Sequence, residues 1–247
     1  MSNASEGTPS RQERTYRTNA VVLRTYKSGE ADRIVVLMTE AEGKVRAIAK
    51  GARKSKRTAA LLDSLGHIDV QMYRGKGDLD TVTQVQSVDS FSAIRSDLDR
   101  FTRAASFVEA VDHVTPDREP HEQMYRMLVG ALRTVDGKNH TLTSAGFFLK
   151  LLALEGLEPV LDRCVSCGDT EGLVSFDPVN CGTRCNSCRS GIPLSDEGIR
   201  ICRLILTGGL AAALKLPDSP VLADVNHLAT TMVEHQTERR LKSLSTI

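Results

Sequence analysis

Two Cys-x-x-Cys pairs constrain the fold of this chain more than any other feature. The first pair is Cys164-Val-Ser-Cys167 and the second is Cys185-Asn-Ser-Cys188, with seventeen residues between them. A Cys-x-x-Cys turn directs both thiolates to one side, so each pair supplies half of a tetrahedral donor set. We therefore expect Cys164, Cys167, Cys185 and Cys188 to bind one structural Zn²⁺ with no open coordination position. Two disulfides, or buried free thiols, are the alternatives.

Composition indicates a globular chain in a reducing compartment. The chain has 247 residues, of which 40% are hydrophobic and 26% charged, with a formal net charge of +1. This length suits one large domain or two small ones. No apolar export signal precedes Arg14, so the cysteines favour metal binding in a cytoplasmic protein. No apolar run approaches the ~20 residues of a membrane span. Residues 1–15 are rich in Ser, Gly, Pro and charge, which predicts a disordered tail.

The first third of the chain has the pattern of β-strands. Alternating or continuous short apolar runs predict strands at residues 18–26, 33–39, 44–50, 67–73 and 79–88. In the third of these, small apolar residues alternate with Lys44, Arg46 and Lys50, which predicts a half-buried strand with a basic outer face. Five short strands with one irregular connection favour a small closed barrel of the OB type over residues 16–90.

A helical period begins near Ser96 and continues toward the C-terminus. Amphipathic helices are predicted over residues 98–111 and 124–135, and an almost wholly apolar core helix over 145–157. The stripe expected on the first helix consists of Leu98, Phe101, Ala105, Val108 and Val111. Further helices are predicted at 195–206 and 224–241. The chain is therefore predicted to be α+β, with a helical domain at 91–247 that carries a zinc-binding insertion at 164–191.

The sequence lacks the motifs of common enzyme classes. It contains no P-loop, dinucleotide fingerprint, zincin motif or zinc-deaminase motif. Four thiolate ligands would also leave the metal no position at which to activate water. The remaining cysteines, Cys181 and Cys202, have no identifiable basic partner that would activate them. We therefore expect a protein that is not an enzyme.

A basic stretch is the strongest indication of a binding surface. Residues 44–57 hold seven cations and no acidic residue, in a chain whose net charge is +1. Like charges at this density repel one another unless an anionic ligand is bound, and OB-type barrels commonly bind single strands of nucleic acid. The expected DNA contacts are Lys44, Arg46, Lys50, Arg53, Lys54, Lys56 and Arg57, joined by Arg74 and Lys76 from the following turn.

Binding of this kind would depend on phosphates, with little sequence selectivity and a strong dependence on salt. Tyr26 and Tyr73 are the outward aromatic side chains that could stack on bases. Two other interpretations of the basic stretch remain. It could be a solvated loop, or the face of a zinc-ribbon scaffold protein that binds acidic protein partners without DNA.

Several short segments match those of a known family. They are Val22–Arg24, Gly29–Arg33, Gly43–Arg46, Ala49–Arg53, Tyr73–Gly75, Leu79–Thr81 and, between the cysteine pairs, Phe176–Pro178. With these segments and the cysteine spacing, the chain resembles the bacterial RecO family of recombination mediators from about Tyr16 to the last helix. The family usually has two glycines where this chain has Cys181-Gly182, so Cys181 resembles a substitution and not a fifth metal ligand.

The resemblance implies an N-terminal OB-fold, a helical C-terminal domain and a zinc clip within it. It also implies a function in DNA repair and recombination through the RecF pathway, in a nucleoid-associated protein. Members of the family bind single- and double-stranded DNA and anneal complementary strands. With RecR they help to load RecA onto DNA coated by single-strand-binding protein, whose acidic C-terminal tail they contact.

Overall fold

The computed structural model describes residues 14–244, which divide into two compact units. The barrel unit comprises the residues through Ser90 together with Thr115–Arg126, and the helical unit comprises Phe91–Val114 and the residues from Met127 onward. The sequence pattern does not indicate that Thr115–Arg126 returns to the barrel. This segment is the main addition that the structure makes to the predicted organisation.

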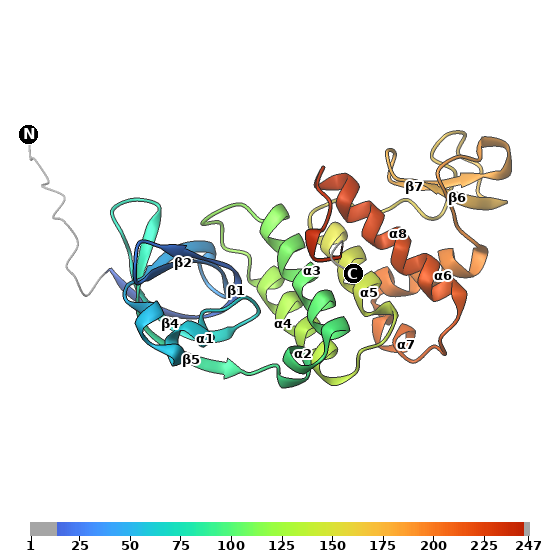
Figure 1. The fold of residues 1–247 in the computed structure, drawn as a ribbon. Helices are drawn as coiled ribbons and strands as arrows, with labels where there is room; N and C mark the ends of the chain where they lie inside the picture. Colours follow the sequence, from blue (N-terminus) through green and yellow to red (C-terminus); the bar gives the residue numbers. More distant parts are fainter. Residues whose placement is uncertain (1–13, 245–247) are drawn as a thin grey trace, which may run out of the picture. The chain divides into compact units, whose positions relative to one another are not determined.

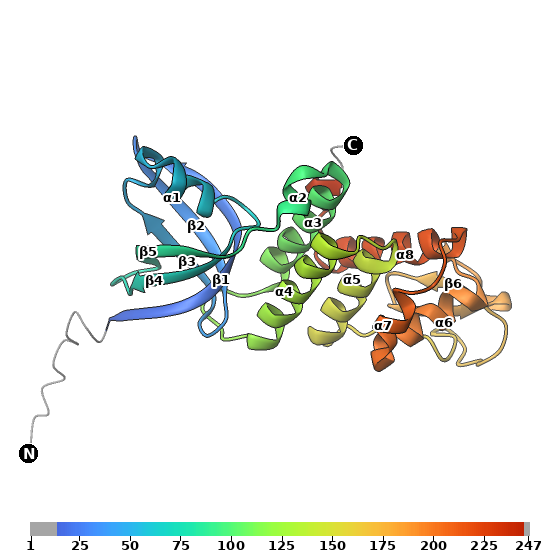
Figure 2. The ribbon, with the colours of Figure 1, turned by 90° about the horizontal axis from the view of Figure 1, so that it is seen from below.

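Five strands close the barrel, as predicted from their apolar alternation (Figures 1 and 2). They are β1 (Thr15–Ser28), β2 (Asp32–Thr39), β3 (Gly43–Ala49), β4 (His67–Tyr73) and β5 (Leu79–Asp89). Around the barrel the order is β1-β2-β3-β5-β4. Every neighbouring pair is antiparallel except β3 and β5, which run parallel. Inward side chains such as Val35, Leu37, Val45, Ile68 and Val70 form the core.

The connection between β3 and β4 is helical, whereas the sequence predicted an irregular basic loop. A 3₁₀ turn at Ala52–Lys54 leads into helix α1, Lys56–Leu61. The hydroxyl of Ser55 caps α1 by accepting a hydrogen bond from the Thr58 N–H at 3.2 Å. Leu61 packs against the barrel core and holds the helix there. A helix of six residues is too short to show a recognisable apolar stripe in the sequence.

The helical unit is built around α5, as predicted. Its helices are α2 (Ser92–Ser96), α3 (Leu98–Val114), α4 (Glu122–Gly137, which begins in the barrel unit), α5 (Leu142–Leu154), α6 (Asp196–Leu204), α7 (Leu210–Ala213) and α8 (Pro220–Gln236). Every residue of α5 from Leu142 to Leu149 is buried. Phe107 of α3 stacks on Phe147 of α5, with ring centroids 4.3 Å apart. None of the described helices has both the length and the apolar character of a membrane span.

The predicted stripe of α3 is wrong in its first half. Leu98 is 74% exposed and Phe101 is 41% exposed, although Val108 and Val111 are buried as expected. The buried face contains Ala104, Ser106, Phe107 and Ala110 instead. Small residues on that face carry little hydropathy, so a neighbouring set of larger residues gave the stronger periodic pattern.

The last two long helices differ in how well their limits were predicted. Ser195 caps α6 by accepting a hydrogen bond from the Gly198 N–H at 3.2 Å, which confirms the predicted start. The final helix, α8, begins earlier than predicted because Pro220 occupies its first turn, where a missing N–H costs nothing. It ends at Gln236, before the predicted limit at residue 241.

Candidate metal centre and nucleic-acid interface

The four cysteines of the two pairs lie in a small sheet within the helical unit. The strands β6 (Leu173–Asp177), β7 (Gly182–Cys185) and β8 (Ile192–Pro193) form the order β7-β6-β8. In the turn that carries the first pair, the Gly168 N–H donates to the Cys164 carbonyl at 2.9 Å. Gly168 has a φ of +82°, a conformation that few residues other than glycine adopt.

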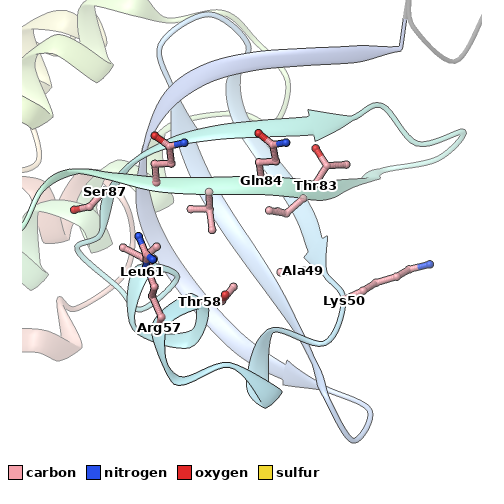
Figure 3. Close-up of a pocket in the computed structure, with 11 residues that line it drawn as sticks. Ala49, Lys50, Arg57, Thr58, Leu61, Thr83, Gln84 and Ser87 are labelled. Atoms are coloured by element: carbon pink, nitrogen blue, oxygen red, sulfur yellow. The ribbon is translucent and has the colours of Figure 1, made fainter.

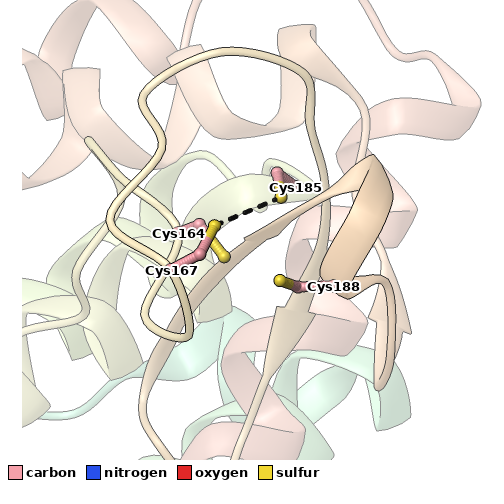
Figure 4. A group of neighbouring side chains, drawn as sticks. All are labelled: Cys164, Cys167, Cys185 and Cys188. Carbon is pink, nitrogen blue, oxygen red and sulfur yellow. Dashed lines mark hydrogen bonds between the residues drawn. The ribbon is translucent and has the colours of Figure 1, made fainter.

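The thiol geometry fits a single tetrahedral metal ion. The four Sγ atoms all lie within 4.8 Å of one another, and Figure 4 shows them directed toward a common point. The Sγ atoms of Cys167 and Cys185 are 3.6 Å apart. That distance exceeds the ~2.05 Å of a disulfide and is close to the ~3.8 Å edge of a tetrahedron with 2.3 Å metal–sulfur bonds. All four thiols are free, so the disulfide alternative does not apply.

The electrostatics of the cluster favour a bound cation. The N–H of Cys185, helped by those of Cys167 and Ser166, lowers the pKa of the Cys164 thiol to about 6. At Cys167 the Asp169 backbone lowers the pKa, but hydrogen bonds with the other three thiols outweigh this and raise it to about 12. Four clustered thiols therefore cannot all ionise alone, and a metal ion would supply the compensating charge.

Cys181 and Cys202 lie outside this cluster. Burial raises the pKa of the Cys202 thiol, on α6, to about 12. This thiol therefore stays protonated and unreactive in the core. Cys181 has a φ of +48°, so a non-glycine residue occupies the left-handed region just before β7. Its thiol donates to the Leu157 carbonyl at 3.6 Å. The structure brings neither residue into the metal-binding group.

The nine predicted DNA-contacting cations do not form one free surface. Lys44 was expected on the outer face of β3 but is only 8% exposed, and its ammonium lies 3.3 Å from Asp117. The segment Thr115–Arg126 covers this position. Arg74 is ion-paired with Glu42 at 2.5 Å, and its guanidinium lies 5.1 Å from the centre of the Tyr16 ring.

Two more of these cations are partly engaged in the barrel itself. Arg53 donates to the carbonyls of Gly29 and Glu30 at 3.2 and 2.8 Å, which ties the 3₁₀ turn to the β1–β2 connection. Arg46 is half-buried on β3. The other five cations are exposed, and none forms an ion pair within residues 14–244: Lys50, Lys54, Lys56, Arg57 and Lys76.

Three of these free cations lie beside or within a groove on the barrel (Figure 3). A hollow of about 890 Å³ separates α1 from β5, with Lys50, Arg57 and Thr58 on one side and residues 82–87 on the other. Lys56 precedes Arg57 in the first turn of the same helix. No acidic residue lines this hollow. The groove therefore offers cations on one wall and hydroxyl or amide groups on the other.

A second hollow continues the first across β5. It has a volume of about 630 Å³ and lies over β1, β4 and β5, with Tyr73 among its lining residues. Lys50, Thr83 and Gln84 line both hollows, so the two adjoin. Tyr73 is thus placed where a base could stack, whereas Tyr26 lines neither hollow. The uncharged polar residues of β5 were not predicted as site residues, because nothing distinguishes them from ordinary outward side chains.

The segment that buries Lys44 is held to the barrel by a charged network. Arg118 lies 2.9 Å from the fully buried carboxylate of Asp80. Asp80 also accepts hydrogen bonds from the Tyr16 hydroxyl and, at 3.1 Å, from the Gly75 N–H. Burial would raise the pKa of Asp80, but these hydrogen bonds outweigh it and hold the pKa below its usual value. Farther along the segment, the hydroxyl oxygen of Tyr125 lies 2.9 Å from Nε2 of the buried His67.

Comparison with known proteins identifies the family. The family model described as "Recombination protein O N terminal" matches residues 14–91, and "Recombination protein O C terminal" matches residues 95–245. The chain belongs to the RecO family. A "DNA repair protein RecO" from Cutibacterium acnes is 38% identical over 93% of this chain and 97% of its own length. A second, from a Nocardioides species, is 35% identical over 93% and 98% of the two chains.

The RecO match spans both units, so the barrel, the helical unit and the cysteine sheet are all parts of one family architecture. The relatives are named as DNA repair proteins. The resemblance predicted from short segments and cysteine spacing is confirmed over nearly the whole chain. A function in DNA repair therefore follows from family membership.

Proposed function

We propose that this chain is a recombination mediator that binds single- and double-stranded DNA through its barrel and anneals complementary strands. The observation that carries the proposal is the groove between α1 and β5, with free cations on one wall and no acidic residue in its lining. Lys50, Lys54, Lys56 and Arg57 would neutralise phosphates, with Lys76 at the end of the β4–β5 hairpin. Family membership supports the role in repair.

Annealing needs no covalent step and no catalytic residue. Two strands must be brought together while the repulsion between their phosphates is neutralised, and exposed lysine and arginine side chains do this by displacing counterions. Thr83 and Gln84, between the two hollows, can hydrogen-bond to bases or sugars without selecting a sequence. Lys44 is left out of the proposed DNA contacts, because it is buried beneath the segment Thr115–Arg126 and Asp117 already neutralises it.

The ion that we propose for the cysteine cluster is one structural Zn²⁺, held by Cys164, Cys167, Cys185 and Cys188. Four thiolates in a tetrahedral arrangement are a typical structural zinc set, and they leave no position for a substrate. The metal would stabilise the sheet of β6, β7 and β8. It would take no direct part in DNA binding.

The protein partners that we propose follow from family membership. They are RecR, with which the chain would load RecA, and the acidic C-terminal tail of single-strand-binding protein. The alternative function is a scaffold whose basic face binds acidic proteins and never DNA. Single-stranded oligonucleotide at physiological salt separates the two, because a scaffold would leave the oligonucleotide unbound.

The test of DNA binding is a salt titration against fluorescent single-stranded DNA, with annealing followed in the same samples. The variant Lys54→Glu, Lys56→Glu, Arg57→Glu removes three phosphate contacts, so the slope of log affinity against log salt should fall by about 2, at ~0.7 per contact. The control reverses three exposed cations of the helical unit: Lys138→Glu, Lys215→Glu and Arg240→Glu. Equal slopes for the two variants would contradict the assignment of the groove.

A further inference from the structure

The barrel closes incompletely along β5. The pairing between β3 and β5 extends over only three residue pairs, Arg46 with Leu79 to Ile48 with Thr81. β5 itself continues to Asp89 and is paired with β4 along that length. Within residues 14–244, residues 82–87 have no strand partner other than β4. One edge of β5 is therefore open for six residues, and the hollow of about 890 Å³ lies along it.

This edge has neither a proline nor a charged residue to prevent pairing with another strand. Proteins usually block such an edge with proline, a charged residue, a bulge or a covering element. Residues 82–87, Val-Thr-Gln-Val-Gln-Ser, contain no proline and no charge. The pairing register shifts at Thr83, which is a single bulge, and α1 stands across the hollow. The unpaired edge of residues 82–87 thus faces the hollow between β5 and α1 (Figure 3).

The side chains around the edge define the chemistry of that ligand. Val82, Val85 and Leu61 are partly buried against the barrel core and present apolar surface to the groove. Lys50 and Arg57 lie at the opposite wall, and no acidic residue is present. An extended peptide has side chains that alternate between two faces. Its apolar side chains would meet the valines, and its acidic side chains would meet the cations.

We propose that the open edge of β5 binds an extended acidic segment of a partner protein by β-strand addition. The backbone of residues 82–87 would hydrogen-bond to the added strand, while Lys50 and Arg57 would select acidic residues. This goes beyond the proposed DNA function and shares two of its cations. Peptide and DNA would therefore exclude each other, so an acidic partner could displace the barrel from DNA.

The test uses a fluorescein-labelled peptide of alternating glutamate and valine, about eight residues long, which covers the ~20 Å of the edge. We expect the full chain to bind it, measured by anisotropy. Amide hydrogen exchange within residues 82–87 should slow by about tenfold or more on binding, because these N–H groups acquire partners. Arg57→Glu should weaken binding about fivefold, whereas Lys215→Glu, an exposed charge in the helical unit, should leave it unchanged.

Three results would overturn the proposal. They are absence of peptide binding, binding without slowed exchange at residues 82–87, and equal binding of a peptide of alternating lysine and valine. If single-stranded DNA slows exchange at these residues and the acidic peptide does not, the edge belongs to nucleic acid. Failure of the proposed DNA function is a separate result, since it would appear as a lack of oligonucleotide binding by the unaltered chain.

Discussion

At the scale of single residues, the barrel depends on the buried carboxylate of Asp80. Replacing Arg118 by Ala would leave this charge with only the Tyr16 hydroxyl and the Gly75 N–H. We expect the barrel unit to lose about 2 kcal/mol of unfolding free energy at neutral pH, because a buried charge that loses its partner is costly. Urea unfolding measures this loss. The double variant Arg118→Ala, Asp80→Asn should recover much of it, since no buried charge then remains.

The pKa of Asp80 adds a pH dependence to this prediction. Its folded pKa lies below the unfolded value, so its contribution to stability is fully present above about pH 4 and is lost as pH falls through the folded pKa. The stability of the unaltered chain should therefore approach that of Asp80→Asn in acid. A difference that stays constant from neutral pH to pH 3 would contradict this assignment.

Cys181 supplies a second prediction at the residue scale. Its φ of +48° costs a non-glycine residue about 1 kcal/mol, and Gly would relieve this cost. The greater conformational freedom of the unfolded chain with Gly would cancel part of the gain. Cys181→Gly should therefore gain about 0.5 kcal/mol in unfolding free energy. Cys181→Ala keeps the strained conformation without the thiol and should show no such gain. An equal gain in both variants would assign the effect to the thiol and not to the backbone.

At the scale of elements, the cysteine sheet should depend on its metal. Cys164→Ser removes one buried ligand, so bound zinc should fall from about one per chain toward zero and the melting temperature should drop by at least about 5 °C. Metal content by elemental analysis and thermal unfolding by circular dichroism measure both effects. The matched control is Cys181→Ala, which should keep its metal. A Cys164→Ser protein with full metal content would disprove the proposed ligand set.

The sequence predicted elements best where large apolar residues mark the buried face. All five strands and the central helix α5 were predicted in this way. The group of four cysteines was predicted from the local spacing of the two pairs. The apolar pattern predicted the wrong face for the first half of α3, because Ala104 and Ser106 are buried there while Leu98 and Phe101 are exposed. It also missed α1, whose position depends on the barrel and not on its own short pattern.

Tertiary structure also decided which of the predicted site residues are free. Lys44 and Lys50 both alternate outward on the third predicted strand, and nothing local separates them. Lys44 is buried because a segment more than seventy residues later brings Asp117 to it, whereas Lys50 stays exposed. Such long-range pairing has no periodic pattern in the sequence. The sequence therefore located the basic stretch, but not which of its cations are exposed.

At the scale of the whole molecule, the two units should lose stability independently. All six cysteines lie in the helical unit, and the core of the barrel unit contains none. Removal of metal by a chelator should therefore lower the unfolding temperature of the helical unit and leave the barrel transition in place, as calorimetry would resolve. Single-stranded DNA affinity at fixed salt should change by less than about twofold, because the phosphate contacts belong to the barrel.

Arg118→Ala provides the reciprocal measurement, since it should lower the barrel transition and leave the metal-dependent one unchanged. Together the two perturbations separate a structural role for the metal from a role in DNA binding. If chelation abolished DNA affinity while the barrel transition stayed in place, the metal would have to act on the binding surface directly. If both transitions moved together under either perturbation, the chain would unfold as one cooperative body, and the assignment of stability to separate units would be wrong.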